Sequence, residues 1–189
     1  EDFVASEEAL IAGGERPEVA FDSYLYVGEE VGEVALVYDW CFDRLTPEQR
    51  TRWLAYADQA VWNVWHNDEA VWGLNPFPWS GWSVDNPSNN YYYSFLRATM
   101  LLGLAARGEL DSADTWVSTF RDAKLETQLF PTFERDLAGG GSREGTGYGV
   151  SMARLFELSD WWEATTGERV ADRTAHTRAS LPAMIHSVV

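Results

Sequence analysis

The sequence is poor in cysteine, in long apolar runs and in basic residues, and each of these features excludes a class of protein or partner. It has one cysteine, Cys41, so no intrachain disulfide can form, and because Cys41 lies in an apolar run we expect it to be a buried structural thiol. No stretch approaches the roughly 18 to 20 apolar residues of a membrane-spanning helix, which argues against membrane insertion. Basic residues are scarce: 14 Lys and Arg stand against 30 Asp and Glu, for a net charge of -16. That charge repels nucleic acid and anionic lipid, so we expect neither as a partner.

The net negative charge also disfavours the binding of a polyanionic sugar. To bind one, the chain would need local cations such as Arg97, Arg135 and Arg143 to dominate the cleft; otherwise the acidity serves solubility alone. Aromatic residues are abundant, with ten Trp, eight Tyr and nine Phe. Such rings fill helix interfaces and also line sugar-binding clefts, so their number does not decide between the two.

Apolar residues recur at every third or fourth position over most of the chain, which predicts an all-α protein. Thr46, Pro47 and Gln49 form a capping-box pattern that predicts a helix running to about His66. Asp111 is the predicted N-cap of a later helix. Strand patterns are weak. About six helices are expected, over residues 29–42, 47–66, 89–107, 111–128, 148–166 and from about 170 onward.

Two long breaks separate these helices, at residues 67–88 and at about 129–147. Long loops in compact domains are often binding loops. Helix pairs with long loops on one side fit an incomplete (α/α) toroid of antiparallel helix hairpins. The apolar stretch 183–189 needs something to pack on, so we expect residues 1–189 to be a single helical domain taken from a longer protein.

Two loop-to-helix junctions carry the residues best suited to chemistry, one over Asp85–Tyr93 and one over Gly139–Gly149. Amides at a helix N-terminus can hold an anionic oxygen. A tyrosine can carry a proton when its pKa is lowered, and Arg143 near Tyr148 would favour the phenolate. Glycines in the second junction would let a polymer approach the backbone.

Each junction also has a purely structural interpretation. Ser88 or Asn89 can be no more than an N-cap, the usual role of these residue types at a helix start. The Tyr91–Tyr93 run can be partly core, and the glycine segment can be a flexible connection. Residue types alone therefore leave both interpretations open.

Taken together, the junctions match a pair of motifs in order and spacing. The run Asn89-Asn90-Tyr91 at a helix start resembles the Asn-Asn-His helix of heparinase II/III-like and alginate lyases. Gly140–Tyr148 resembles their Gly-x-x-x-Glu-Gly-x-x-Tyr segment, and Val37–Trp40 with Leu45–Arg50 resembles their upstream helix pair. The resemblance covers roughly residues 17–170.

The resemblance implies a polysaccharide lyase that cleaves uronate-containing chains by β-elimination, without a cofactor, on a helical toroid followed by β-sandwich domains. Asn90 would hydrogen-bond the uronate carboxylate and so make the C5 proton more acidic. Tyr148 would be the general acid, and in some members also the base, with Arg143 and Glu144 orienting it. The implied partners are an anionic polysaccharide and the missing downstream domain. The implied location is periplasmic or extracellular.

One position departs from the pattern, because Tyr91 stands where many members have His. Either Tyr91 takes over proton abstraction, or the base comes from elsewhere, or activity is lost. Two alternatives therefore stay open. The domain can be a catalytically inactive carbohydrate-binding or scaffold domain, or an α/α-barrel glycoside hydrolase that uses carboxylates such as Asp85 and Glu144.

Substrate contacts are predicted beside the catalytic candidates. Asn89 and Tyr92 flank Asn90 and Tyr91 in sequence. Trp79 and Trp82 are candidates for stacking on a sugar ring, and packing of the loop core is an equal alternative for both. We expect no metal, because no His-Glu-x-x-His spacing exists.

Overall fold

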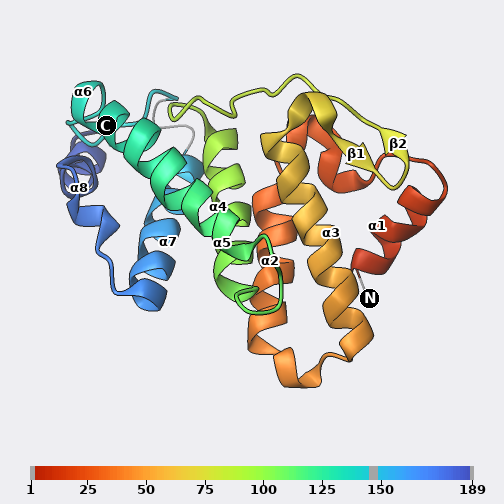
Figure 1. The fold of residues 1–189 in the computed structure, drawn as a ribbon. Coiled ribbons are helices and arrows are strands. Elements are labelled where there is room, and N and C mark those ends of the chain that lie inside the picture. The colour runs from red at the N-terminus through yellow and green to blue at the C-terminus, as the bar shows by residue number, and fades with distance from the viewer. Residues whose placement is uncertain (1–2, 145–148, 188–189) are drawn as a thin grey trace.

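The structure is a computed structural model that describes residues 3–144 and 149–187. Helices make up most of the described chain, which confirms the all-α prediction (Figure 1). The only strands among the described residues are two-residue segments that pair antiparallel. The elements are α1 (Phe3–Ala12), α2 (Val27–Trp40), α3 (Pro47–Trp65), β1 (Val71–Trp72), β2 (Asn75–Pro76), α4 (Asn90–Ala105), α5 (Ala113–Ser118), a π-helical segment (Thr119–Leu129), α6 (Phe130–Arg135), α7 (Gly149–Thr166) and α8 (His176–Ser187). Short 3-10 turns cover Glu18–Tyr24, Phe42–Arg44, Asn67–Glu69 and Val170–Asp172.

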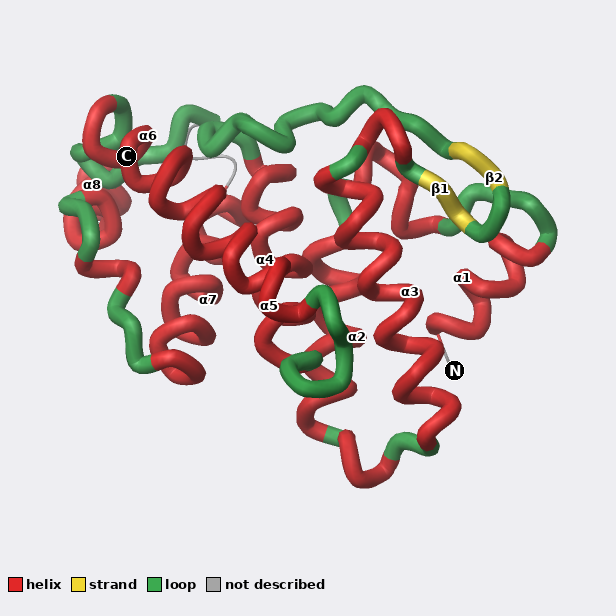
Figure 2. The backbone as a smooth tube through the Cα atoms, viewed as in Figure 1, coloured by secondary structure: helices red, strands yellow, loops and turns green. Residues whose placement is uncertain are grey.

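The described chain thus holds eight α-helices where about six were predicted. One addition is α1, which precedes the first predicted helix. The other is α6, because the stretch predicted as one helix after Asp111 continues through α5 and the π-helical segment into α6. Figure 2 shows these three segments running on without an intervening loop.

Of two predicted N-caps, the one at the start of α3 is confirmed and the one at the start of α5 is wrong. At α3 the Thr46 hydroxyl accepts from the Gln49 backbone N–H at 3.2 Å and the Gln49 side chain accepts from the Thr46 N–H at 2.9 Å, so the capping box is confirmed. The prediction of Asp111 as a cap is wrong, since α5 begins at Ala113 after Ser112. The Ser112 hydroxyl donates to Asp58 of α3, so a contact between helices determines this start.

Cys41 is exposed, so the prediction of a buried thiol is wrong. The apolar run around it belongs to α2, but that helix ends at Trp40 and Cys41 lies in the turn that follows. Apolar neighbours in sequence did not bury it because the chain turns outward there.

Helix α4 is the centre of the molecule, buried on nearly every side from Asn90 to Gly103. It contributes to two apolar clusters, one shared with α1, α2 and α3 and the other with the π-helical segment, α6 and α7. Its approach to α2 is close because Gly28 has no side chain. The Gly28 N–H donates to Ser94 Oγ at 2.8 Å, and a Cβ on Gly28 would lie 2.6 Å from the Ser94 carbonyl oxygen.

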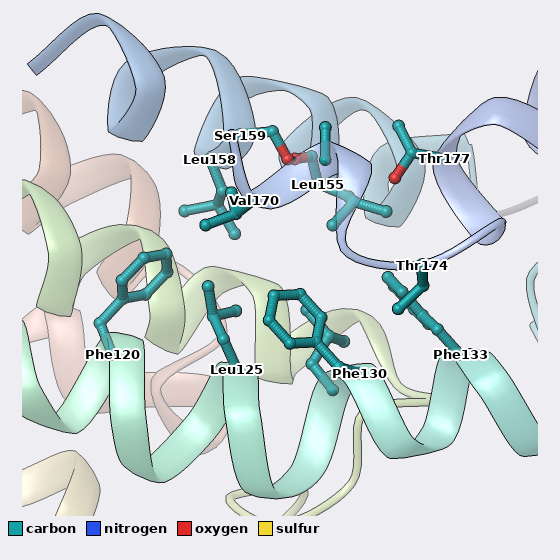
Figure 3. A pocket seen from close by; sticks show the side chains of 12 residues that line it. Phe120, Leu125, Phe130, Phe133, Leu155, Leu158, Ser159, Val170, Thr174 and Thr177 are labelled. Carbon is teal, nitrogen blue, oxygen red and sulfur yellow. Dashed lines mark hydrogen bonds between the residues drawn. The ribbon is translucent and has the colours of Figure 1, made fainter. Parts of the chain in front are cut away.

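The second cluster is a closed apolar seam (Figure 3). Phe120, Leu125 and Phe130 point across it toward Leu155 and Leu158 of α7. The free space between them is about 10 Å³, at most enough for one water molecule. This seam therefore holds helices together and leaves no room for a ligand.

The long loop after β2 crosses the upper ends of the helices and leads into α4 (Figure 1). The indole Nε1 of Trp79 donates to the Asn63 carbonyl at 2.9 Å. Further along, Lys124 Nζ donates to Asp85 Oδ1 at 2.8 Å and to the Val84 carbonyl at 3.0 Å. These contacts fix the loop over the helix ends and so determine where α4 begins.

Glu7 of α1 is a buried carboxylate, with 1% of its surface exposed. Its oxygens accept from the backbone N–H groups of Glu18 and Val19 at 3.0 and 3.1 Å and from the Tyr56 hydroxyl at 2.9 Å. The single side chain therefore joins α1, α3 and the turn that precedes α2. No helix among the described residues is long and apolar enough to cross a membrane.

The raised pKa of Glu30 on α2 predicts that the free energy of unfolding depends on pH. Burial, and then the negative charges of Glu7, Glu18, Glu29 and Glu33, raise the pKa of Glu30 from an ordinary 4.5 to about 7. Between about pH 5 and 7 the folded state then holds more protons than the unfolded state, so stability falls as pH rises through this window.

We expect Glu30→Gln to remove this dependence and to be more stable than the wild type at pH 8, by about 1–2 kcal/mol after allowance for partial exposure. Urea unfolding at pH 5 and pH 8 measures it. Asp39→Asn is the control, because Asp39 is exposed on the same helix and is not among the charges that raise the pKa of Glu30. An equal difference between wild type and Glu30→Gln at both pH values would contradict the assignment.

Candidate functional site

The two junctions predicted to carry chemistry meet at the N-terminus of α4. Asn89 caps this helix, since its side-chain oxygen accepts from the Tyr91 backbone N–H at 3.1 Å. The other end of the same amide donates to Glu144 Oε1 at 3.0 Å. The second Glu144 oxygen accepts from the Ser151 hydroxyl of α7 at 3.1 Å. Asn89 therefore caps the helix and also links two segments 55 residues apart in the chain.

Asn90 is the first residue of α4 and is 8% exposed. Among the described residues its side-chain amide has no hydrogen-bond partner, although its backbone carbonyl accepts from Arg154 at 3.2 Å. Arg154 is buried and also pairs with Glu29 of α2. A mostly buried amide at a helix N-terminus is suited to bind a carboxylate, while Arg154, paired with Glu29, holds the backbone carbonyl of the same residue.

Tyr91 lies against a strained turn. Its hydroxyl donates to Asp22 Oδ1 at 3.0 Å. Asp22, Ser23 and Tyr24 follow one another with φ values of 45, 55 and 61°, a left-handed conformation that costs on the order of 1–3 kcal/mol for each non-glycine residue. Strain of this kind persists where the surrounding structure enforces it, often at functional sites. The turn brings a carboxylate to the phenol of Tyr91.

We call the N-terminus of α4, where Asn89 contacts Glu144, the corner. The three predicted cations, Arg97, Arg135 and Arg143, differ in how exposed they are. Arg97 points inward, pairing with Glu157 at 2.8 Å and donating to the Gly28 carbonyl, so it is not a surface cation. Arg135 and Arg143 are exposed and share one carboxylate, Asp136, at 2.7 and 3.1 Å. Both cations are therefore paired with one acid, and Arg143 lies next to Glu144 in the sequence.

The glycine segment is packed, not loose, at Gly140. Gly140 has φ +82°, and a Cβ there would overlap the Ser180 backbone of α8. The next carbonyl, that of Gly141, accepts from His176 Nε2 at 3.1 Å. Helix α8 therefore supports the loop that leads to Glu144.

Three of the predicted substrate contacts, Tyr92, Trp79 and Trp82, differ in their exposure to solvent. Tyr92 is fully buried, and its hydroxyl donates to Gln128 at 3.0 Å, so the prediction that it touches substrate is wrong for this structure. Helical spacing turns it away from Asn89 and into the core. Trp79 packs in the loop core, 5.2 Å from the Tyr24 ring, whereas Trp82 is 55% exposed and available for stacking. The predicted general acid, Tyr148, lies outside the described residues.

Residues that the sequence did not single out complete the corner: Arg154, Glu29, Ser151 and Asp22. Arg154 and Glu29 are 125 positions apart, and Tyr91 and Asp22 are 69 apart. Nothing local in sequence marks such pairs. For Ser151 a weak indication existed, because it lies seven residues after Glu144 at the start of a predicted helix.

No protein-family model, curated protein or solved structure matches the chain. The interpretation of this corner therefore rests on its own residues and on the motifs they form.

Asn89 both caps α4 and bonds Glu144, so we expect two substitutions of Asn89 to destabilise the fold by different amounts. Asn89→Ala loses both the cap and the bond to Glu144, and we expect it to destabilise the fold by about 2 kcal/mol. Asn89→Ser retains a capping hydroxyl and loses only the bond to Glu144, so its effect should be about half as large. Thermal unfolding of the two variants measures this. Equal losses would mean that the bond to Glu144 contributes nothing.

Proposed function

We propose that this domain belongs to a polysaccharide lyase that cleaves uronate-containing glycans by β-elimination. The observation that carries the proposal is the meeting of the two junctions at the N-terminus of α4, where Asn89 bonds Glu144 and the amide of Asn90 has no partner among the described residues. The same proposal takes the helices as part of an incomplete (α/α) toroid of antiparallel hairpins. It assigns the domain to a longer periplasmic or extracellular protein with a downstream domain.

In the proposed reaction the uronate carboxylate binds the Asn90 amide, and Arg154 positions this residue by donating to its backbone carbonyl at 3.2 Å. Neutralising the carboxylate stabilises the enolate that forms when C5 loses its proton. The Tyr91 oxygen accepts that proton while its own phenolic proton passes to Asp22, to which it is already hydrogen-bonded. The C4–O bond then breaks, the C4–C5 double bond forms, and Tyr148 protonates the leaving oxygen.

A glycoside hydrolase receives less support from this geometry. Its general acid would need a raised pKa. The hydrogen bond from Lys124, followed by that from Gln128, lowers the pKa of Asp85, which keeps this carboxyl ionised. An inactive sugar-binding domain is the second candidate, favoured by Tyr91 in place of His and by the net charge of -16.

The deciding experiment incubates the full-length protein with alginate, heparan sulfate or hyaluronan. Elimination creates an unsaturated uronate whose ultraviolet absorbance grows with each cleavage, whereas hydrolysis gives reducing ends without absorbance. Loss of the absorbance in Tyr148→Phe would support the assigned general acid. Binding without turnover on all three glycans would favour the inactive domain, and reducing ends without absorbance would favour the hydrolase.

A further inference from the structure

Two buried residues, one helical turn apart, hold α8 against the loop that precedes Glu144. Of the twelve residues of α8, only His176 and Ser180 are buried. Gly140 packs against the Ser180 backbone, and the Gly141 carbonyl accepts from His176 Nε2 at 3.1 Å. An element held by few buried groups opens locally at a lower free energy than the core does. The contacts of His176 therefore decide how firmly this helix is held.

The environment of His176 accommodates one ring proton and not two. The residue is 1% exposed, and its ring stacks on Phe133 of α6 with the ring centroids 3.8 Å apart. Because the Gly141 carbonyl can only accept, the proton of the neutral ring is on Nε2. Nδ1 is buried and has no hydrogen-bond partner among the described residues. A second proton would place a charged N–H there without an acceptor, which is costly in a buried position.

Among the described residues no charged side chain bonds the His176 ring. The charged side chains on the elements around it are exposed or bonded to other groups: Glu134, Arg135, Asp136, Arg143, Glu144, Asp172, Arg173 and Arg178. Burial lowers the pKa of His176 below its ordinary 6.5, and the hydrogen bond to Gly141 opposes this shift only in part. The folded protein thus resists the charged form of this ring.

We propose that His176 makes the packing of α8 on the Gly139–Gly141 loop sensitive to pH. At neutral pH the uncharged ring holds the Gly141 carbonyl. Below about pH 6.5 a histidine in the opened helix gains a proton that the packed helix excludes, so the packed form loses stability as the pH falls. The loop then loses the support of α8 on the path to Glu144. An effect on catalysis rests on the lyase proposal, whereas the opening of α8 does not.

Hydrogen exchange of the full-length protein at about pH 7.5 and 5.5 tests the proposal. Protection factors remove the intrinsic pH dependence of exchange, so they report the opening equilibrium alone. We expect the protection of the α8 backbone amides to fall by up to about tenfold over this interval, because a proton bound only by the open form shifts the equilibrium by that factor for each pH unit below 6.5. Equal protection of α8 at both pH values would overturn the proposal.

Two variants assign the effect to one ring. His176→Gln removes the titration and retains an amide that can donate to the Gly141 carbonyl, so its α8 protection should be the same at both pH values. His186→Gln is the matched control, because His186 is exposed on the same helix, and it should show the fall of the wild type. A fall of wild-type size in folded His176→Gln would also overturn the proposal. Circular dichroism checks folding, and His176→Phe, which keeps a ring on Phe133, gives the same test if His176→Gln does not fold. Exchange is measured without a glycan, so its outcome is independent of the lyase proposal.

Discussion

Replacing Asn90 by Asp should slow β-elimination by about 10²–10³-fold, the usual cost of removing one donor that stabilises a developing anion. The substitution keeps the shape of the side chain but places a negative charge where the uronate carboxylate binds. Initial rates of absorbance increase on the preferred glycan measure the effect. We expect the variant to stay folded, because a carboxylate in the first turn of a helix is favourable.

Asn86→Asp is the control for Asn90→Asp. It adds the same charge four residues earlier and keeps the oxygen that accepts from the Ser88 N–H. We expect it to change the rate far less than Asn90→Asp does. If the two variants lose activity equally, general repulsion of the substrate explains the loss. If neither loses activity, Asn90 does not contact the carboxylate.

Glu7→Ala should lower the free energy of unfolding by about 3–5 kcal/mol. Three buried donors, the N–H groups of Glu18 and Val19 and the hydroxyl of Tyr56, would lose their acceptor together. Each buried donor left unsatisfied costs about 1–3 kcal/mol, and costs within one network are not additive. Urea unfolding at neutral pH measures the loss.

Glu8→Ala provides the comparison on the same helix. Glu8 pairs with Arg52 at the surface, where 35% of the Glu8 side chain and 31% of the Arg52 side chain are exposed. Such a pair contributes at most about 1 kcal/mol. A loss in Glu7→Ala no larger than that in Glu8→Ala would mean that water replaces the carboxylate without cost.

Local chemistry explains the features of the fold that could be predicted. The capping box at Thr46 and the cap at Asn89 are patterns of a few adjacent residues, and both helices begin where those patterns predict. The start of α5 could not be predicted in this way. Asp111 has the right residue type, but the bond from Ser112 to Asp58 depends on α3 lying alongside.

The residues of the candidate site also fall into those that local sequence indicates and those that packing between distant segments brings in. Asn90, Glu144 and Asn89 lie next to recognisable breaks in the sequence, and the structure brings Asn89 and Glu144 into direct contact. Arg154 and Asp22 reach the corner only through the packing of α2, α4 and α7. Two neighbouring tyrosines have opposite environments, because successive helix positions differ by about 100°. Tyr91 faces the strained turn, while Tyr92 faces the core.

The absence of a side chain at Gly140 makes α8 a remote determinant of the geometry of the candidate site. The backbone of α8 occupies the space that a Cβ would need, so the Gly139–Gly141 loop can keep its path only while α8 stays seated. That loop leads directly to Glu144, which is bonded in turn to the cap of α4. A substitution that displaces α8 would therefore disturb the contact between Glu144 and Asn89 without altering any residue proposed to contact sugar.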